Sequence, residues 1–268
     1  MPLAIKTGHV DPVSHLIIPD HHSYPEDDFR RFDWLGNLIL ERQPEIIVSI
    51  GDGWDMGSLC SYDKGKKSFV FKNVKEDIEA GHKAENLFLG SIDKYNNTRT
   101  KIKKKKYTPL FVKCIGNHEI RVDRVLSYEP RWEGTIGMSD FNTRTNVREV
   151  VVPFLSSGLV DGILYSHYFV SGVMGRPVSS ARALIMKKGV SCTMGHTHTL
   201  ETHSMAKPMG GLARGLICGS FHDKEHESFA GSQVDDLWWN GLIYKHNVVD
   251  GDYDHEEISI KRLEKLYG

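Results

Sequence analysis

The sequence predicts an α/β fold, a sheet of largely parallel strands covered by helices. Residues 15–20 form an apolar run typical of a buried strand, 25–45 carry apolar residues at helical spacing, and 45–52 form a second apolar run. A strand, a helix and a strand within about forty residues indicate a parallel pair with a right-handed crossover. With 268 residues, 40 % of them hydrophobic, we expect a single domain over 1–268.

The remaining segments continue this pattern, with one irregular region. Residues 56–107 contain a helical stretch at 74–95 and a basic run, and they are expected to form an inserted connection outside the central sheet. From about residue 210 the chain is β-rich, with a hairpin turn predicted at Asp250-Gly251, and is expected to supply the second sheet. The other expected elements are strands at 107–117, 161–167 and 190–198 and helices at 119–130 and 179–189.

Composition excludes several classes of protein. The formal net charge of -1 gives no general attraction to nucleic acid or to an anionic membrane. The four cysteines show no C-x-x-C spacing, which indicates a reducing compartment without a disulfide framework. The N-terminus lacks a secretory pattern and no stretch approaches 18 apolar residues, so we expect a cytoplasmic protein without a membrane partner.

Five apolar runs end in residues that can bind metal ions. Each ending taken alone reads as an ordinary turn, because Gly, Asp and Asn are common turn residues. The carboxyl ends of parallel strands lie together in space, however, so the five endings can form one site. They read "IIPDHH", "VSIGDGWD", "VKCIGNHE", "ILYSH" and "CTMGHTH".

As an ordered set, these motifs resemble the calcineurin-like metallophosphoesterase superfamily. The resemblance covers residues 15 to about 220 and consists of D-x-H, G-D-x-x-D, G-N-H-E, a strand-terminal His and G-H-x-H. It implies a four-layer α/β/β/α sandwich with two divalent metal ions at the carboxyl ends of the strands. The implied reaction is hydrolysis of a phosphate ester by in-line attack of a metal-bridging hydroxide.

Carried over position by position, the resemblance implies seven metal ligands. Asp52 would bridge the two ions, and His21 would be a neighbour of the site. Mixed nitrogen and oxygen ligands are compatible with Mn²⁺, Fe and Zn²⁺, and Mn²⁺ is the expected occupant. One ion would be held by Asp20, His22, Asp52 and His198, and the other by Asp52, Asn117, His167 and His196.

Three further residues are implied in catalysis. His118 would donate a proton to the leaving oxygen, and Glu119 could orient its imidazole. Arg121 could clamp a phosphate with two hydrogen bonds or be a solvated helix residue. Asp55 would support the site without binding metal.

Three classes of function remain open. They are a phosphodiesterase or nuclease acting on nucleotides or nucleic acid, a phosphomonoesterase acting on phosphoproteins or small molecules, and a catalytically silent metal-bound interaction module. The third is disfavoured because His118 and every implied ligand are present. Met56 stands where Ser/Thr phosphatases carry an arginine, and "CTMGHTH" and "SHYF" look more like bacterial and phage phosphodiesterases.

Some features keep two interpretations. The run "KIKKKK" at 101–106 is either a solvated loop or a contact for a polyanion. Trp238 and Trp239 either pack in the core or stack on a base. The other histidines match no motif, although His222 and His226 could lie near the mouth of the site.

Overall fold

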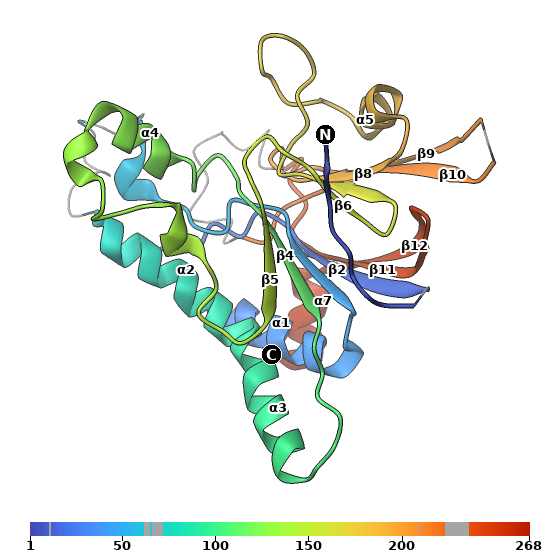
Figure 1. Cartoon of the computed structure of the whole chain (residues 1–268), viewed down its shortest axis with the longest axis horizontal. Coiled ribbons are helices and arrows are strands. Elements are labelled where there is room, and N and C mark those ends of the chain that lie inside the picture. Colours follow the sequence, from blue (N-terminus) through green and yellow to red (C-terminus); the bar gives the residue numbers. More distant parts are fainter. Residues whose placement is uncertain (11, 62–64, 66–71, 209, 223–235) are drawn as a thin grey trace.

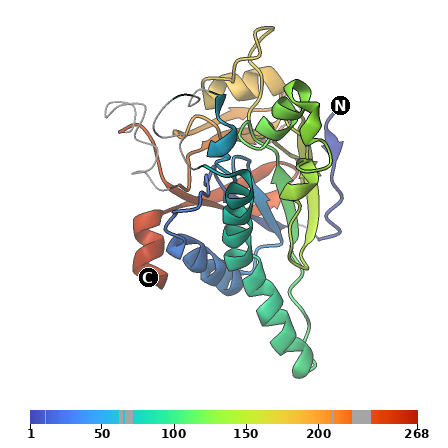
Figure 2. The same cartoon turned by 90° about the vertical axis from the view of Figure 1, so that its left-hand side faces the viewer.

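The chain folds into two six-stranded sheets packed face to face, with helices on both outer faces (Figures 1 and 2). The computed structural model describes residues 1–10, 12–61, 65, 72–208, 210–222 and 236–268. Its layers are helices, sheet, sheet and helix, in agreement with the predicted α/β/β/α order.

One sheet has the strand order β12-β11-β2-β3-β4-β5. Its strands β2 to β5 are parallel, while β11 runs antiparallel to β2 and β12 antiparallel to β11. The parallel strands point their carboxyl ends to one edge of the sandwich. Their bounds are β2 (Val13–Ile18), β3 (Ile46–Ser49), β4 (Leu110–Cys114), β5 (Arg148–Val152), β11 (Gly241–Val249) and β12 (Asp252–Ser259).

The other sheet has the order β1-β6-β7-β8-β10-β9. Strands β7, β8 and β10 are parallel to one another, and β6 and β9 are antiparallel to their neighbours β7 and β10. The bounds are β1 (Leu3–Ala4), β6 (Gly158–Val160), β7 (Ile163–Tyr165), β8 (Ser191–Met194), β9 (Leu200–Ala206) and β10 (Leu212–Cys218).

Helices cover the first sheet on one side, and α5 covers the second sheet on the other (Figure 2). Several begin at a residue whose side chain caps the first turn, such as Asn73 before α2 and Ser180 before α5. The bounds are α1 (Arg30–Arg42), α2 (Val74–Phe88), α3 (Gly90–Lys101), α4 (Arg121–Tyr128), α5 (Ala181–Lys188) and α7 (Ile260–Tyr267), with short 3-10 turns at Gly57–Leu59, Pro130–Trp132 and Met138–Phe141.

Alternation along the buried strands explains why both faces of the first sheet are covered. In β2, Leu16 and Ile18 pack against the helices, whereas Ile17 packs between the two sheets. In β4, Phe111 faces the helices and Val112 faces the other sheet. Successive side chains of a strand point to opposite faces, so a continuous apolar run is what such a sheet requires.

The C-terminal part differs from expectation in two ways. The hairpin turn at Asp250-Gly251 is confirmed, since Val249 pairs with Asp252 and both turn residues have positive φ. Of the strands after residue 210, however, β10 joins the second sheet while β11 and β12 join the first, so the second-sheet prediction is wrong for that hairpin. The chain then ends in α7, which the hairpin prediction did not include.

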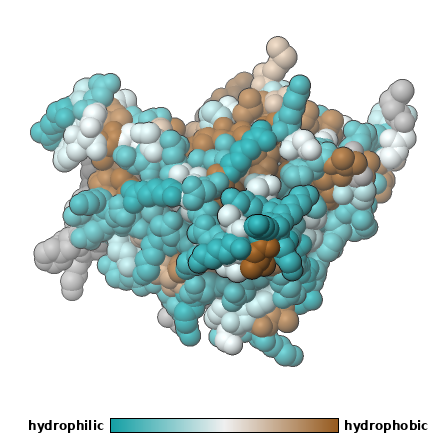
Figure 3. All heavy atoms as spheres, turned by 60° about the horizontal axis from the view of Figure 1, so that its bottom comes forward, coloured by the Kyte–Doolittle hydropathy of each residue, from teal (hydrophilic) through white to brown (hydrophobic). Residues whose placement is uncertain are grey.

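Residues 56–107 form no strand in the part that the structure describes, and their helices are α2 and α3. They are not wholly peripheral, because Phe88 and Leu89 belong to the buried cluster under α1. The end of α3 projects from the body of the molecule. Its last residue, Lys101, and the residues 102–106 that follow it are exposed, and they lie at the end of the molecule that Figure 3 brings forward. Most of that face is hydrophilic. None of the helices in the described part is both long and apolar enough to cross a bilayer.

Candidate metal centre

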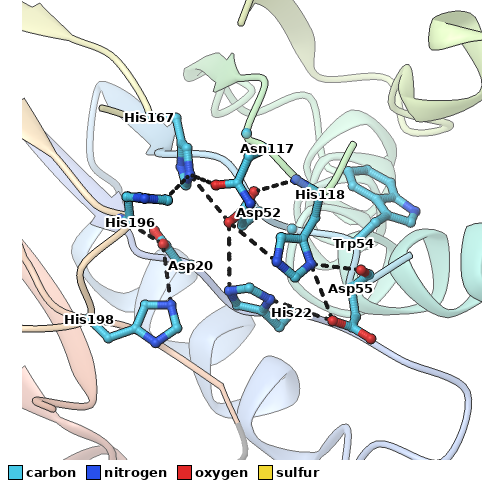
Figure 4. Close-up of polar contacts among 12 residues, drawn as sticks. Asp20, His22, Asp52, Trp54, Asp55, Asn117, His118, His167, His196 and His198 are labelled. Carbon is cyan, nitrogen blue, oxygen red and sulfur yellow. Dashed lines mark hydrogen bonds and ion pairs between the residues drawn. The ribbon is translucent and has the colours of Figure 1, made fainter. Parts of the chain in front are cut away.

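Five loops meet at one edge of the sandwich, and each follows the carboxyl end of a strand. Strands β2, β3 and β4 belong to one sheet, whereas β7 and β8 belong to the other. The loops therefore approach from both sheets, and their polar side chains point toward a common centre (Figure 4). The sequence-predicted residues brought together there are Asp20, His22, Asp52, Asn117, His118, His167, His196 and His198.

The carboxylate of Asp52 lies at the centre of this group. Its Oδ2 is 3.2 Å from Nε2 of His167 and 3.9 Å from Nε2 of both His22 and His118. Its Oδ1 accepts a hydrogen bond from the backbone N–H of His118 at 2.9 Å. One oxygen of Asp52 thus faces three imidazoles that come from different loops, a position suited to a carboxylate shared by two cations.

The first donor group consists of Asp20, His22 and His198, whose ligand atoms all lie within 4.8 Å of one another. Nε2 of His198 is 3.5 Å from Oδ2 of Asp20, which also accepts a hydrogen bond from the backbone N–H of His196 at 2.7 Å. Oδ1 of Asp20 is buried and has no hydrogen-bond partner within the described residues. A buried carboxylate oxygen without a partner is costly, and a cation at this position would satisfy it.

The second donor group consists of Asp52, His167 and His196, within the same 4.8 Å limit. Asn117 adds a further oxygen, because its Oδ1 lies 2.9 Å from Nε2 of His167. Nδ1 of His196 lies 3.2 Å from that same nitrogen. Nδ1 of His167 is 3.2 Å from the carbonyl oxygen of Ile50 and donates to it, which leaves Nε2 facing the group.

Four of these residues have a left-handed backbone conformation. The φ angles are 42° for His22, 50° for Asp52, 72° for His196 and 58° for His198. A non-glycine residue in this region costs roughly 1 kcal/mol or more, and such residues cluster at functional sites where the surrounding structure holds them. At these four positions the left-handed backbone aims the side chains toward one another.

Two glycines allow the carboxylates to reach the centre. A methyl group added to Gly116 would overlap Oδ1 of Asp52, and one added to Gly195 would overlap Oδ1 of Asp20. The glycines of "GNH" and "GHTH" are therefore required by the close approach of a carboxylate to their Cα atoms.

The ionisable side chains of the cluster shift one another's pKa values. Burial opposes the charged form of His167, but the charges of Asp52 and Asp20 outweigh burial and raise its pKa to about 9. Burial and the nearby His167 lower the pKa of His196 to about 4. Burial disfavours charge on Asp52 as well, yet the His167 and His118 imidazoles hold its pKa well below the usual range. The site is therefore built around anionic carboxylates that need positive charge.

His118 lies beside Asp52 with both ring nitrogens engaged. Its Nδ1 is 2.7 Å from the backbone carbonyl oxygen of Asp55 and 3.2 Å from the Asp55 carboxylate. Nη2 of Arg121 lies 3.1 Å from Nε2 of His118, while Nη1 donates to the carbonyl oxygen of Asp55 at 2.7 Å. The ring is therefore fixed with Nδ1–H donating to the loop after β3 and with Nε2 turned toward Asp52.

Glu119 does not orient His118, so that prediction is wrong. Its buried carboxylate accepts hydrogen bonds from four backbone N–H groups at 2.6 to 3.2 Å, with two on each oxygen. Glu119 therefore shapes the turn after β3 that carries Asp52. Burial, together with the nearby charge of Asp52, raises its pKa. The donors are the amides of Asp52, Gly53, Trp54 and Gly116.

The carboxylate of Asp55 lies close enough to His22 and His118 to be a metal ligand, beyond its predicted supporting role. A third set of ligand atoms within 4.8 Å of one another comprises His22, Asp55 and His118. Nδ1 of His22 lies 3.8 Å from Oδ1 of Asp55. His21 stays outside all three sets, as expected: it is buried, it contacts the hydroxyl of Ser23 at 2.9 Å, and its ring meets Phe32 edge-on.

Sequence reasoning gave no firm position to His222 and Trp238. The His222 ring is 4.9 Å from that of His198 and 5.8 Å from that of His22, and the Trp238 ring is 4.8 Å from that of His198. Trp239 packs against the core between the sheets. Backbone hydrogen bonds hold the neighbours of His222 and Trp238 at the site. The N–H of Phe221 donates to the carbonyl oxygen of Asp20 at 2.8 Å, and the N–H of Trp239 donates to that of His198 at 2.9 Å. His226 lies outside the described residues.

The donor set fits a divalent cation on the chemistry of its side chains. Imidazole, carboxylate and amide oxygen ligands suit Mn²⁺, Fe and Zn²⁺. The buried Oδ1 of Asp20 lacks a hydrogen-bond partner in the part of the chain that the structure describes, and a cation there would satisfy it. The described residues can therefore hold a metal ion.

Comparison with known proteins gives remote likenesses. No protein-family model matches the chain, and no curated protein matches its sequence. Among solved structures, Vps29 from Entamoeba histolytica, complexed with Zn²⁺, has 13 % identity and a TM-score of 0.37, over 92 % of this chain and 99 % of that chain. YfcE, a phosphoesterase from E. coli, has 10 % identity and a TM-score of 0.37 over the same shares, 92 % and 99 %. The function proposed below rests on the site of this chain.

Proposed function

We propose that the chain is a binuclear metal-dependent phosphoesterase, and that it is a phosphodiesterase or nuclease acting on nucleotides or nucleic acid. The observation that carries this proposal is the position of Asp52, whose Oδ2 faces both donor groups and His118. A shared carboxylate between two sets of nitrogen and oxygen donors, with a histidine beside it, is suited to cleaving phosphate esters.

Asp20, His22, Asp52 and His198 would hold one ion, and Asp52, Asn117, His167 and His196 the other. Mn²⁺ is the expected ion, with Fe or Zn²⁺ compatible with the same donors. When bound, two such cations activate water and stabilise negative charge on the phosphoryl oxygens.

His118 is proposed to donate a proton from Nε2 to the leaving oxygen. Its Nδ1–H is committed to the Asp55 carbonyl oxygen, so Nε2 is the nitrogen available for exchange. The Asp55 carboxylate, 3.2 Å from Nδ1, would stabilise the charged ring once Nε2 has taken up a proton. Arg121 donates to Nε2 when the ring is neutral, and would turn from it to the substrate phosphate when Nε2 carries the proton.

The diester preference is supported by the surroundings of Met56. This residue stands where the resembling Ser/Thr phosphatases carry an arginine, and here it is fully buried in an apolar cluster with Trp54, Val122 and Phe141. The position thus faces the core and offers no cation to a phosphomonoester dianion.

A side-by-side assay tests the proposal. Metal-stripped protein is titrated with Mn²⁺ on a chromogenic phosphodiester and on a chromogenic phosphomonoester, with Asp52→Asn as the blank. Metal-dependent diester cleavage that the blank lacks is the expected result. Cleavage of the monoester alone would instead identify a phosphatase, and no cleavage with metal bound would identify an interaction module.

Two broader expectations accompany the proposal. We infer that residues 1–268 form one catalytic domain, in which 56–107 contribute helices to its outer face. A cytoplasmic location agrees with the four cysteines, all of which are free thiols.

A further inference from the structure

A pocket of about 770 Å³ lies beside the metal centre. It is lined by the start of α1, the start of α7 and the segment that precedes β11. Pockets that bind small molecules and cofactors span roughly 300–1,000 Å³, so its volume suits a ligand of nucleotide size. The lining includes Asp28, Arg30, Trp34, Trp238, Trp239 and Lys261.

The pocket adjoins the first donor group at His222. This residue lines the pocket, and its ring lies 4.9 Å from that of His198 and 5.8 Å from that of His22. Trp238 also contacts both sides, since it lines the pocket and its ring is 4.8 Å from that of His198. A molecule whose phosphate reaches the metal centre would therefore place its neighbouring group in this pocket.

The wall chemistry combines aromatic surface with positive charge. Three indoles, those of Trp34, Trp238 and Trp239, line one pocket. Indole rings stack on nucleobases with little dependence on the base. The side chains of Arg30 and Lys261 are exposed. Arg30 donates from Nε and Nη2 to the carboxylate of Asp28, which also lines the pocket, so Lys261 is the lining cation that can meet an anion.

We propose that this pocket binds the nucleoside part of the phosphate ester. The base contacts the indoles, and Lys261 contacts a phosphate of the same ligand. The inference rests on the proposed function for the position of the scissile phosphate, but binding in the pocket can be measured without turnover.

The experiment compares two ligands that differ only in the base. Adenosine 5′-monophosphate and ribose 5-phosphate are titrated calorimetrically into the full chain without added metal. The nucleotide is expected to bind at least about tenfold more tightly, the ratio that one stacking contact supplies. Equal binding of the two ligands would overturn the inference.

Two pairs of variants locate the binding. Trp34→Leu should remove most of the nucleotide preference, while Trp132→Leu, an exposed tryptophan outside the pocket, should keep it. Lys261→Glu should weaken nucleotide binding severalfold, while Lys265→Glu, in the last turn of the same helix and outside the pocket lining, should not. A preference that survives Trp34→Leu, or a nucleotide affinity that Lys261→Glu leaves unchanged, would contradict the inference.

The two proposals fail separately. Metal-dependent cleavage of a chromogenic diester together with equal binding of the two phosphates would keep the phosphoesterase and reject the nucleoside pocket. A base-dependent affinity that Trp34→Leu abolishes, without any hydrolysis, would keep the pocket and reject the enzyme.

Discussion

Nε2 of His167 lies 3.2 Å from Oδ2 of Asp52, although the strands that precede them, β7 and β3, belong to different sheets. The contact joins the two halves of the sandwich at the edge where the metal centre lies. Each of the two donor groups contains residues that follow strands of both sheets. Assembly of the site therefore depends on the packing between the sheets.

Replacement of His118 should separate metal binding from turnover. His118→Ala is expected to lower kcat on a phosphodiester by about 10²–10⁴-fold, the usual contribution of a positioned proton donor. It should leave Mn²⁺ content unchanged, as measured by elemental analysis. His203→Ala on β9, outside every donor group among the described residues, is the matched control. Full activity in His118→Ala would remove this residue from the mechanism.

Filling the space at Gly195 should displace a ligand. The added methyl group of Gly195→Ala would overlap Oδ1 of Asp20, so we expect weaker metal binding and a loss of roughly 1–3 kcal/mol in the free energy of unfolding. Gly90→Ala is the control, because a methyl group there meets no atom within 4 Å and lies at the start of α3. Denaturant unfolding and Mn²⁺ titration of both variants check the prediction. Equal behaviour of the two would show that Asp20 does not need this close approach.

Lys245 should make stability depend on pH at the alkaline end. It is fully buried between the sheets, where its Nζ contacts the hydroxyls of Thr193 at 2.6 Å and Tyr165 at 3.2 Å. Burial lowers its pKa to about 7, against about 10.4 in an unfolded chain. Between these values the unfolded chain binds more protons than the folded one, so the free energy of unfolding should rise with pH from 7 to 10.

The measurement for Lys245 is urea unfolding at several pH values with metal chelated. Lys245→Met should be more stable than the wild type at pH 7, because it buries no charge, and should show a smaller rise with pH. An identical slope in wild type and variant would mean that Lys245 does not lose its proton in this range.

The lysines at the end of α3 should not contribute to cleavage of a small substrate. Residues 101–106 are exposed on a projection that precedes the first residue of β4. The metal centre lies beyond the last residue of that strand (Figure 1). Neutralising Lys103 to Lys106 should leave chromogenic diester hydrolysis unchanged. If these lysines contact a polyanion, neutralising them should reduce both the affinity for nucleic acid and the dependence of that affinity on salt. Unchanged affinity and salt dependence would assign this run to a solvated loop.

The sequence alone predicts the site residues that directly follow strands. Each apolar run ending in Asp20, Asp52, Asn117, His167 or His196 is a strand or its direct continuation, and these endings converge because parallel strands share an edge. The left-handed turns that aim the side chains have no comparable signal, since only a minority of histidines have positive φ and the residue type at His22 and His198 does not indicate such a turn.

Other features depended on long-range pairing and were not predictable from local pattern. The sequence analysis does not predict strand β5. It places the hairpin of β11 and β12 in the wrong sheet, because the residues of a strand do not indicate which strand it pairs with. Glu119 was assigned to His118 as its sequence neighbour, yet its carboxylate turns to the amides of a loop more than sixty residues away in the chain. The segments that carry His222 and Trp238 are held at the site by backbone hydrogen bonds of Phe221 and Trp239 to the loops after β2 and β8, which no local pattern indicates.

The most direct test of the account is the number of ions that the site holds. Metal-stripped protein is titrated with Mn²⁺ in a calorimeter, beside Asp52→Asn and the surface variant Asp250→Asn. Two ions per chain are predicted for the wild type and for Asp250→Asn, with loss or strong weakening of both in Asp52→Asn, because its carboxylate faces both donor groups. A wild type that takes up no Mn²⁺, Fe or Zn²⁺, or an Asp52→Asn variant that binds like the wild type, would contradict the proposed centre.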